Sequence, residues 1–291
     1  MSDTSSPPAA VSEAERRQRL ELEQAATDHL SRLNGALELQ AAVLALLLPT
    51  GSQRAARAWR LETDATPNAD AVREHVTRLS PAARLPWFEA LVSRMRGQTP
   101  AARQALLEST RRVMGARGVV RPIDRLHWLA MRQRLGAASL AGGRNAAVTD
   151  LSRLPQSDVS AIAVYSAFLS RMVPLDAAPA SQPADAAQTT AGVAWYDTVM
   201  APWQRHATVE PCQPPDTDAV VHALQELQVL AWMQRPVLVR GWVGAARQHS
   251  PHGRLGDGAA DALRLSCALL DSPLPPELAR HYGAAGPQPP R

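Results

Sequence analysis

Apolar residues recur along this chain at the spacing of an α-helix. Between residues 83 and 95, four apolar side chains fall on one helical face: Leu85, Phe88, Val92 and Met95. The composition favours the same structure, because apolar residues make up 45% of the chain and aromatic residues only 4%. Leucine and alanine have the best helix propensities, whereas aromatic strand formers are scarce. The sequence therefore predicts an all-α protein.

Signals for the ends of helices support this prediction. Ser12, followed three residues later by Glu15, forms the pattern of a capping box before the first helical segment. Thr99 and Pro100 suit an N-cap and a first helical turn, and Pro122 suits the first turn of a later helix. We therefore expect helices to begin at these positions.

Two glycine turns give the predicted helices a repeated layout. Gly118, in GVVRPIDRLHWL, and Gly253, in GRLGDGAADALRL, each follow one helix and precede the apolar face of the next. Glycine suits the left-handed backbone conformation that ends many helices. We expect Val120 and Leu255, two residues further on, to occupy equivalent buried positions. The layout predicts two related helical halves packed into one globular unit.

Composition marks the segments that connect these halves. Pro- and Ala-rich or Gly- and Ala-rich stretches are typical of linkers and surface loops. The predicted organisation is a disordered tail (1–12), an N-terminal half (13–136), a linker (137–156), a C-terminal half (157–282) with a Pro/Ala-rich loop (174–191), and a disordered tail (283–291).

Three segments carry a resemblance to a known family. They are residues 45–61 (ALLLPTGSQRAARAWRL), 84–129 (beginning RLPWFEALVSRMRG) and 253–278 (GRLGDGAADALRLSCALLDSPLPPEL). Together they resemble the C-terminal cytosolic region of bacterial HtpX-like membrane zinc metalloproteases, which is similar to tellurite-resistance TerB-like helical domains. The resemblance implies TerB-like helix–turn–helix repeats and action beside a membrane-bound metalloprotease.

The residues that carry the family's chemistry are absent or replaced in this sequence. The chain contains no His-Glu-x-x-His motif, so the resemblance implies no zinc protease activity. The Asp of the TerB-like Asp-Gly pair is Arg117 in the first copy and His252 in the second, and the family's Glu matches Asp124 and Ala259. Hard cations need oxygen ligands, so we predict no bound metal and no other cofactor.

Candidate catalytic and metal-binding residues are few. The sequence has no nucleophile elbow and no phosphate-binding loop, and we predict that the protein is not an enzyme. His249, His252 and Asp257 are weak candidates for a transition-metal site. We favour a solvated polar turn for these three residues, because no second pair of ligands is visible.

Tryptophan is unusually frequent, with seven residues against two phenylalanines. Trp195, Tyr196 and Trp203 lie beside the Pro/Ala-rich loop, where they would form either a partner-binding surface or a lid over the core between the halves. We favour the lid, because large apolar side chains are usually buried. The same residues are the interaction candidates if the lid is absent.

The net charge of +4 raises the question of nucleic-acid binding. All 31 basic residues are Arg, and they are interspersed with 27 acidic residues without a block of five like charges. A local basic patch would need several Arg side chains on one face, and the candidates are Arg111, Arg112, Arg117, Arg121 and Arg125. The linear pattern favours a solvated mixed-charge surface over a nucleic-acid partner.

The longest apolar run, from Leu39 to Leu48, is too short to span a bilayer, and the first residues do not resemble a signal peptide. We therefore expect a cytoplasmic protein that does not span the membrane. The preferred function is a non-enzymatic helical interaction or regulatory module that acts with a protein partner, and the resemblance implies a membrane metalloprotease as that partner. The alternatives are a separately encoded piece of an HtpX-like peptidase without its active site, and an Arg-rich nucleic-acid-binding protein.

Overall fold

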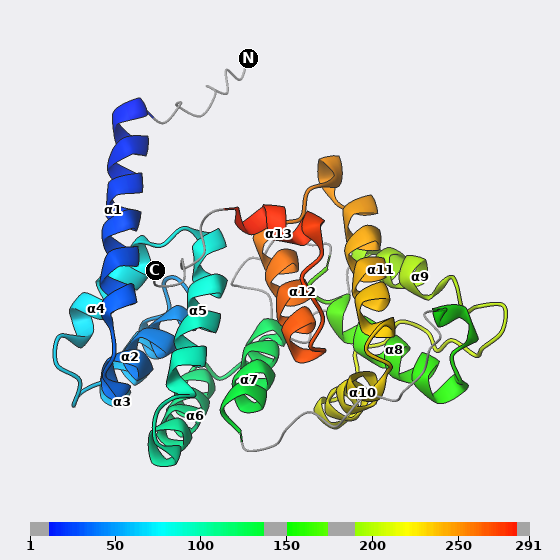
Figure 1. The fold of residues 1–291 in the computed structure, drawn as a ribbon, viewed down its shortest axis with the longest axis horizontal. Coiled ribbons are helices and arrows are strands. Elements are labelled where there is room, and N and C mark those ends of the chain that lie inside the picture. The colour runs from blue at the N-terminus through cyan, green and yellow to red at the C-terminus, as the bar shows by residue number, and fades with distance from the viewer. Residues whose placement is uncertain (1–11, 137–149, 174–189, 284–291) are drawn as a thin grey trace, which may run out of the picture.

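The computed structural model describes residues 12–136, 150–173 and 190–283. Within these ranges the chain forms thirteen α-helices, two short 3-10 helices and no strand (Figure 1). The predicted all-α fold is therefore confirmed. Most of the predicted tails and linkers lie outside the described residues, and these parts are 1–11, 137–149, 174–189 and 284–291.

The first seven helices form one group. They are α1 (Glu13–Arg32), α2 (Ala36–Leu46), α3 (Gln53–Glu62), α4 (Ala69–Arg78), α5 (Pro81–Met95), α6 (Pro100–Gly115) and α7 (Pro122–Leu135). α2 lies at the centre of this group and packs against α3, α4, α5 and α6. The sequence explains this position, because α2 (ALELQAAVLAL) is apolar on almost every face.

Helices α8 to α11 form a second group. The remaining elements are η1 (Leu151–Arg153), α8 (Gln156–Leu169), α9 (Thr190–Met200), α10 (Thr217–Val229), α11 (Gln234–Gln248), η2 (Pro251–Gly253), α12 (Asp257–Leu269) and α13 (Pro276–Tyr282). α8 is the largely buried helix of this group and packs against α9 and α10.

The last two helices connect the groups. α12 packs against α11 on one side and against α5 and α7 on the other, and α13 contacts α5 and α12. In Figure 1, α7 and α12 lie in the middle of an elongated molecule, between the two groups. One connected hydrophobic core runs from Ala26 in α1 to Tyr282 in α13. The two groups therefore share a core.

The predicted helix starts are present. In a capping box before α1, the Ser12 hydroxyl accepts from the Glu15 N–H at 3.2 Å and the Glu15 carboxylate accepts from the Ser12 N–H at 2.8 Å. Thr99 accepts from the Ala102 N–H at 3.2 Å, and Pro100 and Pro122 are the first residues of α6 and α7. The first N–H groups of a helix have no partner within the helix. Ser12 and Thr99 accept hydrogen bonds from such groups, and proline at the first position has no N–H to satisfy.

The two glycine turns share a backbone conformation but differ in packing. Gly118 has φ +80° and Gly253 has φ +66°, so both take the predicted left-handed conformation. The predicted burial of Val120 is wrong, because this side chain is 39% exposed, and Leu255 is half-buried. A buried carboxylate, that of Asp124, holds the first turn in place of the expected apolar side chain. The superposition of the two halves stays a prediction.

The membrane prediction concerns the lengths and apolar content of the helices. Among the residues that the structure describes, no helix combines the length and the hydropathy that a bilayer crossing requires.

Candidate functional site

The three predicted interaction residues lie in α9 and in the turn that follows it, which together we call the α9 segment (residues 190–206), and all three are buried. Trp195 is fully buried in α9, and its indole N–H donates to the Trp242 carbonyl at 3.2 Å. The Tyr196 hydroxyl donates to the Glu210 carbonyl at 2.5 Å, and burial raises its pKa to about 12. The Trp203 indole N–H donates to the Leu151 carbonyl at 2.6 Å.

These contacts favour the lid over the exposed surface, with a correction to its place. The partners of Trp195, Tyr196 and Trp203 all belong to the C-terminal part of the chain, beyond residue 150. The three side chains therefore fill the core of the second group of helices and do not lie between the two groups. The alternative prediction, that these three residues form an exposed binding surface, is wrong because their side chains are buried.

The weak metal candidates do not converge on one point. The His249 Nε2 atom lies 2.7 Å from the Thr198 hydroxyl, whereas Asp257 lies 3.0 Å from the His281 Nε2 atom. His252 is exposed in η2. Within the described ranges, no group of three or more His, Cys, Asp or Glu side chains is arranged to hold a metal ion.

Side chains of the candidate basic patch are engaged within the protein. The Arg111 guanidinium lies 4.6 Å from the centre of the Trp128 ring, and Arg112 donates to the Glu62 carboxylate at 2.5 and 2.7 Å. Arg117 and Arg121 both bind Asp124. Four of the five candidates therefore stabilise the fold around α6 and α7.

Asp124 is a buried carboxylate between two guanidinium groups. It accepts from Arg117 at 2.9 and 3.0 Å and from the Arg121 side chain at 2.9 and 3.1 Å. Burial opposes its ionisation, but the hydrogen bonds from Arg121 and the charges of both Arg residues outweigh burial and lower the pKa of Asp124. Arg117 also donates to the Leu47 carbonyl, which fixes the Gly118 turn against the end of α2.

A second polar cluster lies where the two groups of helices meet. The Glu89 carboxylate in α5 accepts from the Arg264 guanidinium in α12 at 2.8 and 2.9 Å. The Tyr282 hydroxyl in α13 donates to Asp261 in α12 at 3.0 Å, and the Arg264 guanidinium lies 4.4 Å from the centre of the Tyr282 ring. Burial raises the pKa of Asp261 to about 7. Sequence reasoning did not single out these residues.

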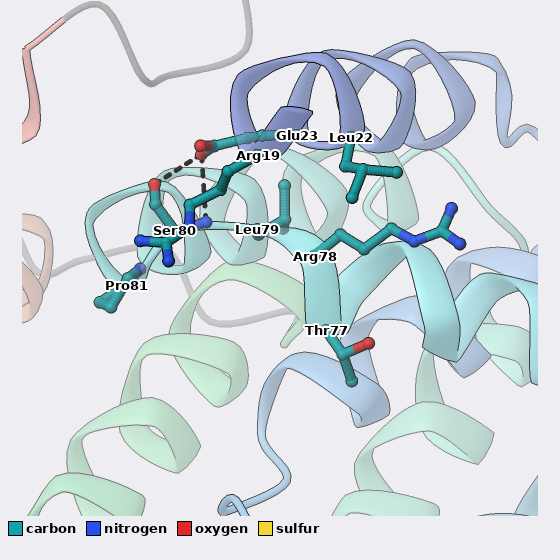
Figure 2. A pocket seen from close by; sticks show the side chains of 8 residues that line it. All are labelled: Arg19, Leu22, Glu23, Thr77, Arg78, Leu79, Ser80 and Pro81. Atoms are coloured by element: carbon teal, nitrogen blue, oxygen red, sulfur yellow. Dashed lines mark hydrogen bonds between the residues drawn. The ribbon is translucent and has the colours of Figure 1, made fainter. Parts of the chain in front are cut away.

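A groove of about 340 Å³ lies between α1 and the junction of α4 with α5, and Figure 2 shows the side chains that line it. Leu22 and Arg19 line it from α1, and Arg78 lines it from α4. The Glu23 carboxylate accepts from the Ser80 N–H at 3.1 Å and from the Ser80 hydroxyl at 2.5 Å. The carboxylate of Glu23 therefore holds the N-cap residue of α5 beside this groove.

An exposed apolar surface lies on α11 and on the turn before it. Trp232 is 69% exposed, Met233 is 39% exposed and Val237 is 37% exposed, whereas the other six tryptophans are buried or half-buried. The exposed face of α11 continues from Val237 with small or cationic residues. We call the whole set the α11 surface, and it comprises Trp232, Met233, Val237, Arg240, Gly241, Gly244 and Arg247.

Two glycines on the α11 surface have no role in the chain's own packing. A methyl group added at Gly241 or Gly244 would meet no heavy atom within 4 Å apart from the adjacent residues and backbone of its own helix. Glycine inside a helix is less stable than alanine by roughly 0.5–1 kcal/mol. The described fold gives no reason for glycine at these positions, whereas a close neighbour outside the chain would give one.

Comparisons with protein-family models, with curated proteins and with solved structures found no match to this chain.

Proposed function

We propose that this chain is a non-enzymatic interaction module that binds a helix of a partner protein across the α11 surface. The observation that carries the proposal is the exposure of Trp232, in a chain that buries Trp59, Trp195 and Trp242 completely. Tryptophan and arginine are enriched among the residues that dominate binding energies. Large apolar side chains that lie together on a surface commonly mark such sites.

The shape of the α11 surface favours a helix as the bound element. Val237, Gly241 and Gly244 lie on one face of α11 at spacings of four and three residues. Packed helices usually lie about 8–10 Å apart, and small residues at the contact allow the shorter distances. Gly241 and Gly244 carry no side chain, so a second helix can approach α11 closely along this face.

The charge of the α11 surface defines the chemistry of the partner. α11 (QRPVLVRGWVGAARQ) contains Arg235, Arg240 and Arg247 and no acidic residue. Arg240 and Arg247 are exposed and flank the glycine face. Complementary charge steers association and fixes orientation, so we expect a partner helix with Asp or Glu beside its apolar positions.

The resemblance to the cytosolic region of HtpX-like proteases adds a candidate for the source of this helix. The resemblance suggests a membrane-bound metalloprotease as the partner and a regulatory or scaffolding role for the chain. This choice of partner is supported by the resemblance alone. Nucleic acid is the less favoured partner, because Arg111, Arg112, Arg117 and Arg121 contact aromatic or acidic side chains of the chain itself.

Site-specific crosslinking tests the proposal. With a photo-reactive amino acid at position 237, we expect one crosslinked protein, joined through an acidic amphipathic helix. A synthetic peptide of that helix should bind the wild-type chain, and Trp232→Ala should weaken binding by about tenfold or more, as hot-spot residues do. A photo-reactive residue at the exposed Leu61 of α3 provides the control and should capture nothing. The proposal is wrong if position 237 captures no partner, or if duplex DNA binds through Arg240 and Arg247 instead.

A further inference from the structure

Two histidines meet face to face where α1 packs on α4. The rings of His29 in α1 and His75 in α4 are stacked, with their centres 4.1 Å apart and their planes 20° apart. Among the helices, α4 makes the most extensive contact with α1, which lies at one end of the molecule (Figure 1). The pair therefore lies within the contact that holds α1 to the rest of the fold.

The stack leaves one nitrogen of each ring without a hydrogen bond. Both side chains are half-buried, but the His29 Nε2 and His75 Nδ1 atoms are shielded from solvent, and neither has a hydrogen-bond partner within the described residues. A neutral imidazole can place its lone-pair nitrogen in such a position, whereas a protonated imidazole donates from both nitrogens. Protonation of either ring would leave a charged N–H group without an acceptor, which costs free energy.

The neighbouring charges also favour a neutral His75. Burial is the largest influence and lowers the pKa of His75, and the charges of His29 and Arg78 lower it further. Glu74 acts in the opposite direction, but its carboxylate is paired with the Arg78 guanidinium at 2.5 Å. The unpartnered nitrogen and the nearby positive charge therefore have the same effect.

Other charged side chains on the packed helices do not reverse this balance. On α1, the Asp28 carboxylate accepts from the Gln24 side chain at 2.9 Å, and Arg32 adds a positive charge one turn after His29. α2 packs on α4 as well, and its one charged residue is Glu38, whose carboxylate accepts from the Gly35 N–H at 3.3 Å. Neither carboxylate forms a hydrogen bond with the stacked rings.

We propose that α1 and α4 form an acid-sensitive contact, which is closed while His29 and His75 are neutral and opens when both are protonated. Two like charges 4.1 Å apart repel each other strongly where little water separates them. Opening separates the rings and gives each protonated nitrogen access to water. It also uncovers the apolar faces that the two helices bury against each other. This contact is separate from the α11 surface and does not depend on the proposed function.

The two states fix the direction of the pH effect. A histidine in water titrates near pH 6.5, and the pKa of His75 is lower than this in the closed state. Below pH 6.5 the open state therefore binds more protons than the closed state, and the open fraction grows as the pH falls. The growth reaches at most about a hundredfold per pH unit if both rings take up a proton. Above about pH 7.5 both states are neutral and the contact no longer responds to pH.

Hydrogen exchange of the α1 amides in the full chain, corrected for the intrinsic pH dependence of exchange, tests this contact. In the wild-type chain, protection of residues 26–32 should fall by about tenfold or more between about pH 7.5 and 5, while the amides of α12 keep their protection. Replacing both histidines by phenylalanine, His29→Phe with His75→Phe, keeps two aromatic rings but leaves nothing to titrate. Protection of α1 in this double variant should not change with pH.

His222→Gln is the matched control, because it removes an exposed histidine from α10 and should keep the wild-type fall. The proposal is overturned if wild-type protection of α1 is independent of pH, or if the double variant keeps the fall. It is also overturned if α1 and α12 lose protection together, since that result shows global unfolding.

A second measurement covers the case in which the double variant does not fold. Proton NMR of the imidazole rings in the wild-type chain follows the titration of His29 and His75 directly. Titration of His75 below pH 6.5, accompanied by loss of α1 protection, supports the proposal. Protonation of both rings while α1 stays protected overturns it.

Discussion

The α9 segment and the α11 surface use the same kind of side chain in opposite ways. Trp195 and Trp203 lie in the core, and each donates its indole N–H to a backbone carbonyl. Trp232 extends from the turn between α10 and α11 and is 69% exposed. A buried tryptophan contributes to the free energy of folding, whereas an exposed tryptophan leaves its ring available for binding, which is the role that we propose for Trp232. The number of tryptophans in the sequence does not separate these roles, but their position relative to the helices does.

Replacing Trp203 tests the buried side of this comparison and should have the largest effect. Trp203→Ala removes a large buried side chain and the donor to the Leu151 carbonyl. We expect a loss of about 3–5 kcal/mol in the free energy of unfolding, measured by urea titration. Partner binding should fall only as the protein unfolds. An unchanged urea midpoint would show that the Trp203 side chain does not contribute to the stability of the fold, and would contradict its assignment to the core.

A smaller effect should follow from removing one hydroxyl in the same segment. Tyr196→Phe keeps the ring and loses the bond to the Glu210 carbonyl. The backbone of Glu210 lies in an exposed stretch, where water can replace the lost donor. We expect a destabilisation of about 1 kcal/mol in the same titration. A loss as large as that of Trp203→Ala would show that the hydroxyl, and not the ring, anchors the segment.

Gly244 on the α11 surface should respond in the opposite direction. Gly244→Ala improves helix propensity where the added methyl group meets no neighbour, so we expect unfolding to require about 0.5–1 kcal/mol more. The same methyl group should weaken binding of the partner helix, because it prevents the closest approach of the two backbones. Tighter binding by this more stable variant would contradict the glycine face as a contact.

The smallest effect on folding should come from Trp232. Trp232→Ala should change the free energy of unfolding by no more than about 0.5 kcal/mol, because the side chain is mostly in solvent. Thermal unfolding measures this quantity, and calorimetry with the crosslinked partner's helix measures binding. A large fall in melting temperature would place Trp232 in the fold and remove the observation that carries the proposed function.

Sequence patterns predicted the helices well wherever apolar periodicity and capping residues agreed, as at Ser12, Thr99 and Pro122. They missed α4, which begins after Asn68 in a left-handed conformation and has no side-chain cap. They also missed α13, because the prolines before it indicate the end of a helix. Pro276 instead occupies the first turn of α13, where a missing N–H has no consequence.

The candidate sites were harder to predict. Trp232 has a signal that sequence reasoning overlooked, since it follows the last apolar positions of the α10 segment and comes shortly before Pro236, at a break between two helices. The cluster around Asp261 has no such signal. Glu89 and Arg264 are 175 residues apart in the chain, and only the packing of α5 against α12 brings them together. Burial of this kind depends on tertiary contacts that local patterns do not encode.

The packing of α12 on α7 has a consequence for synthesis on the ribosome. α7 ends at Leu135, and α12 begins at Asp257, roughly 120 residues later. At typical elongation rates of about 5–20 residues per second, the face of α7 that α12 covers waits about 6 to 24 seconds for its partner. During this interval we expect the first seven helices to form an intermediate in which the face of α7 that α12 later covers is exposed. We expect that face to bind general chaperones until α12 has been synthesised and covers it.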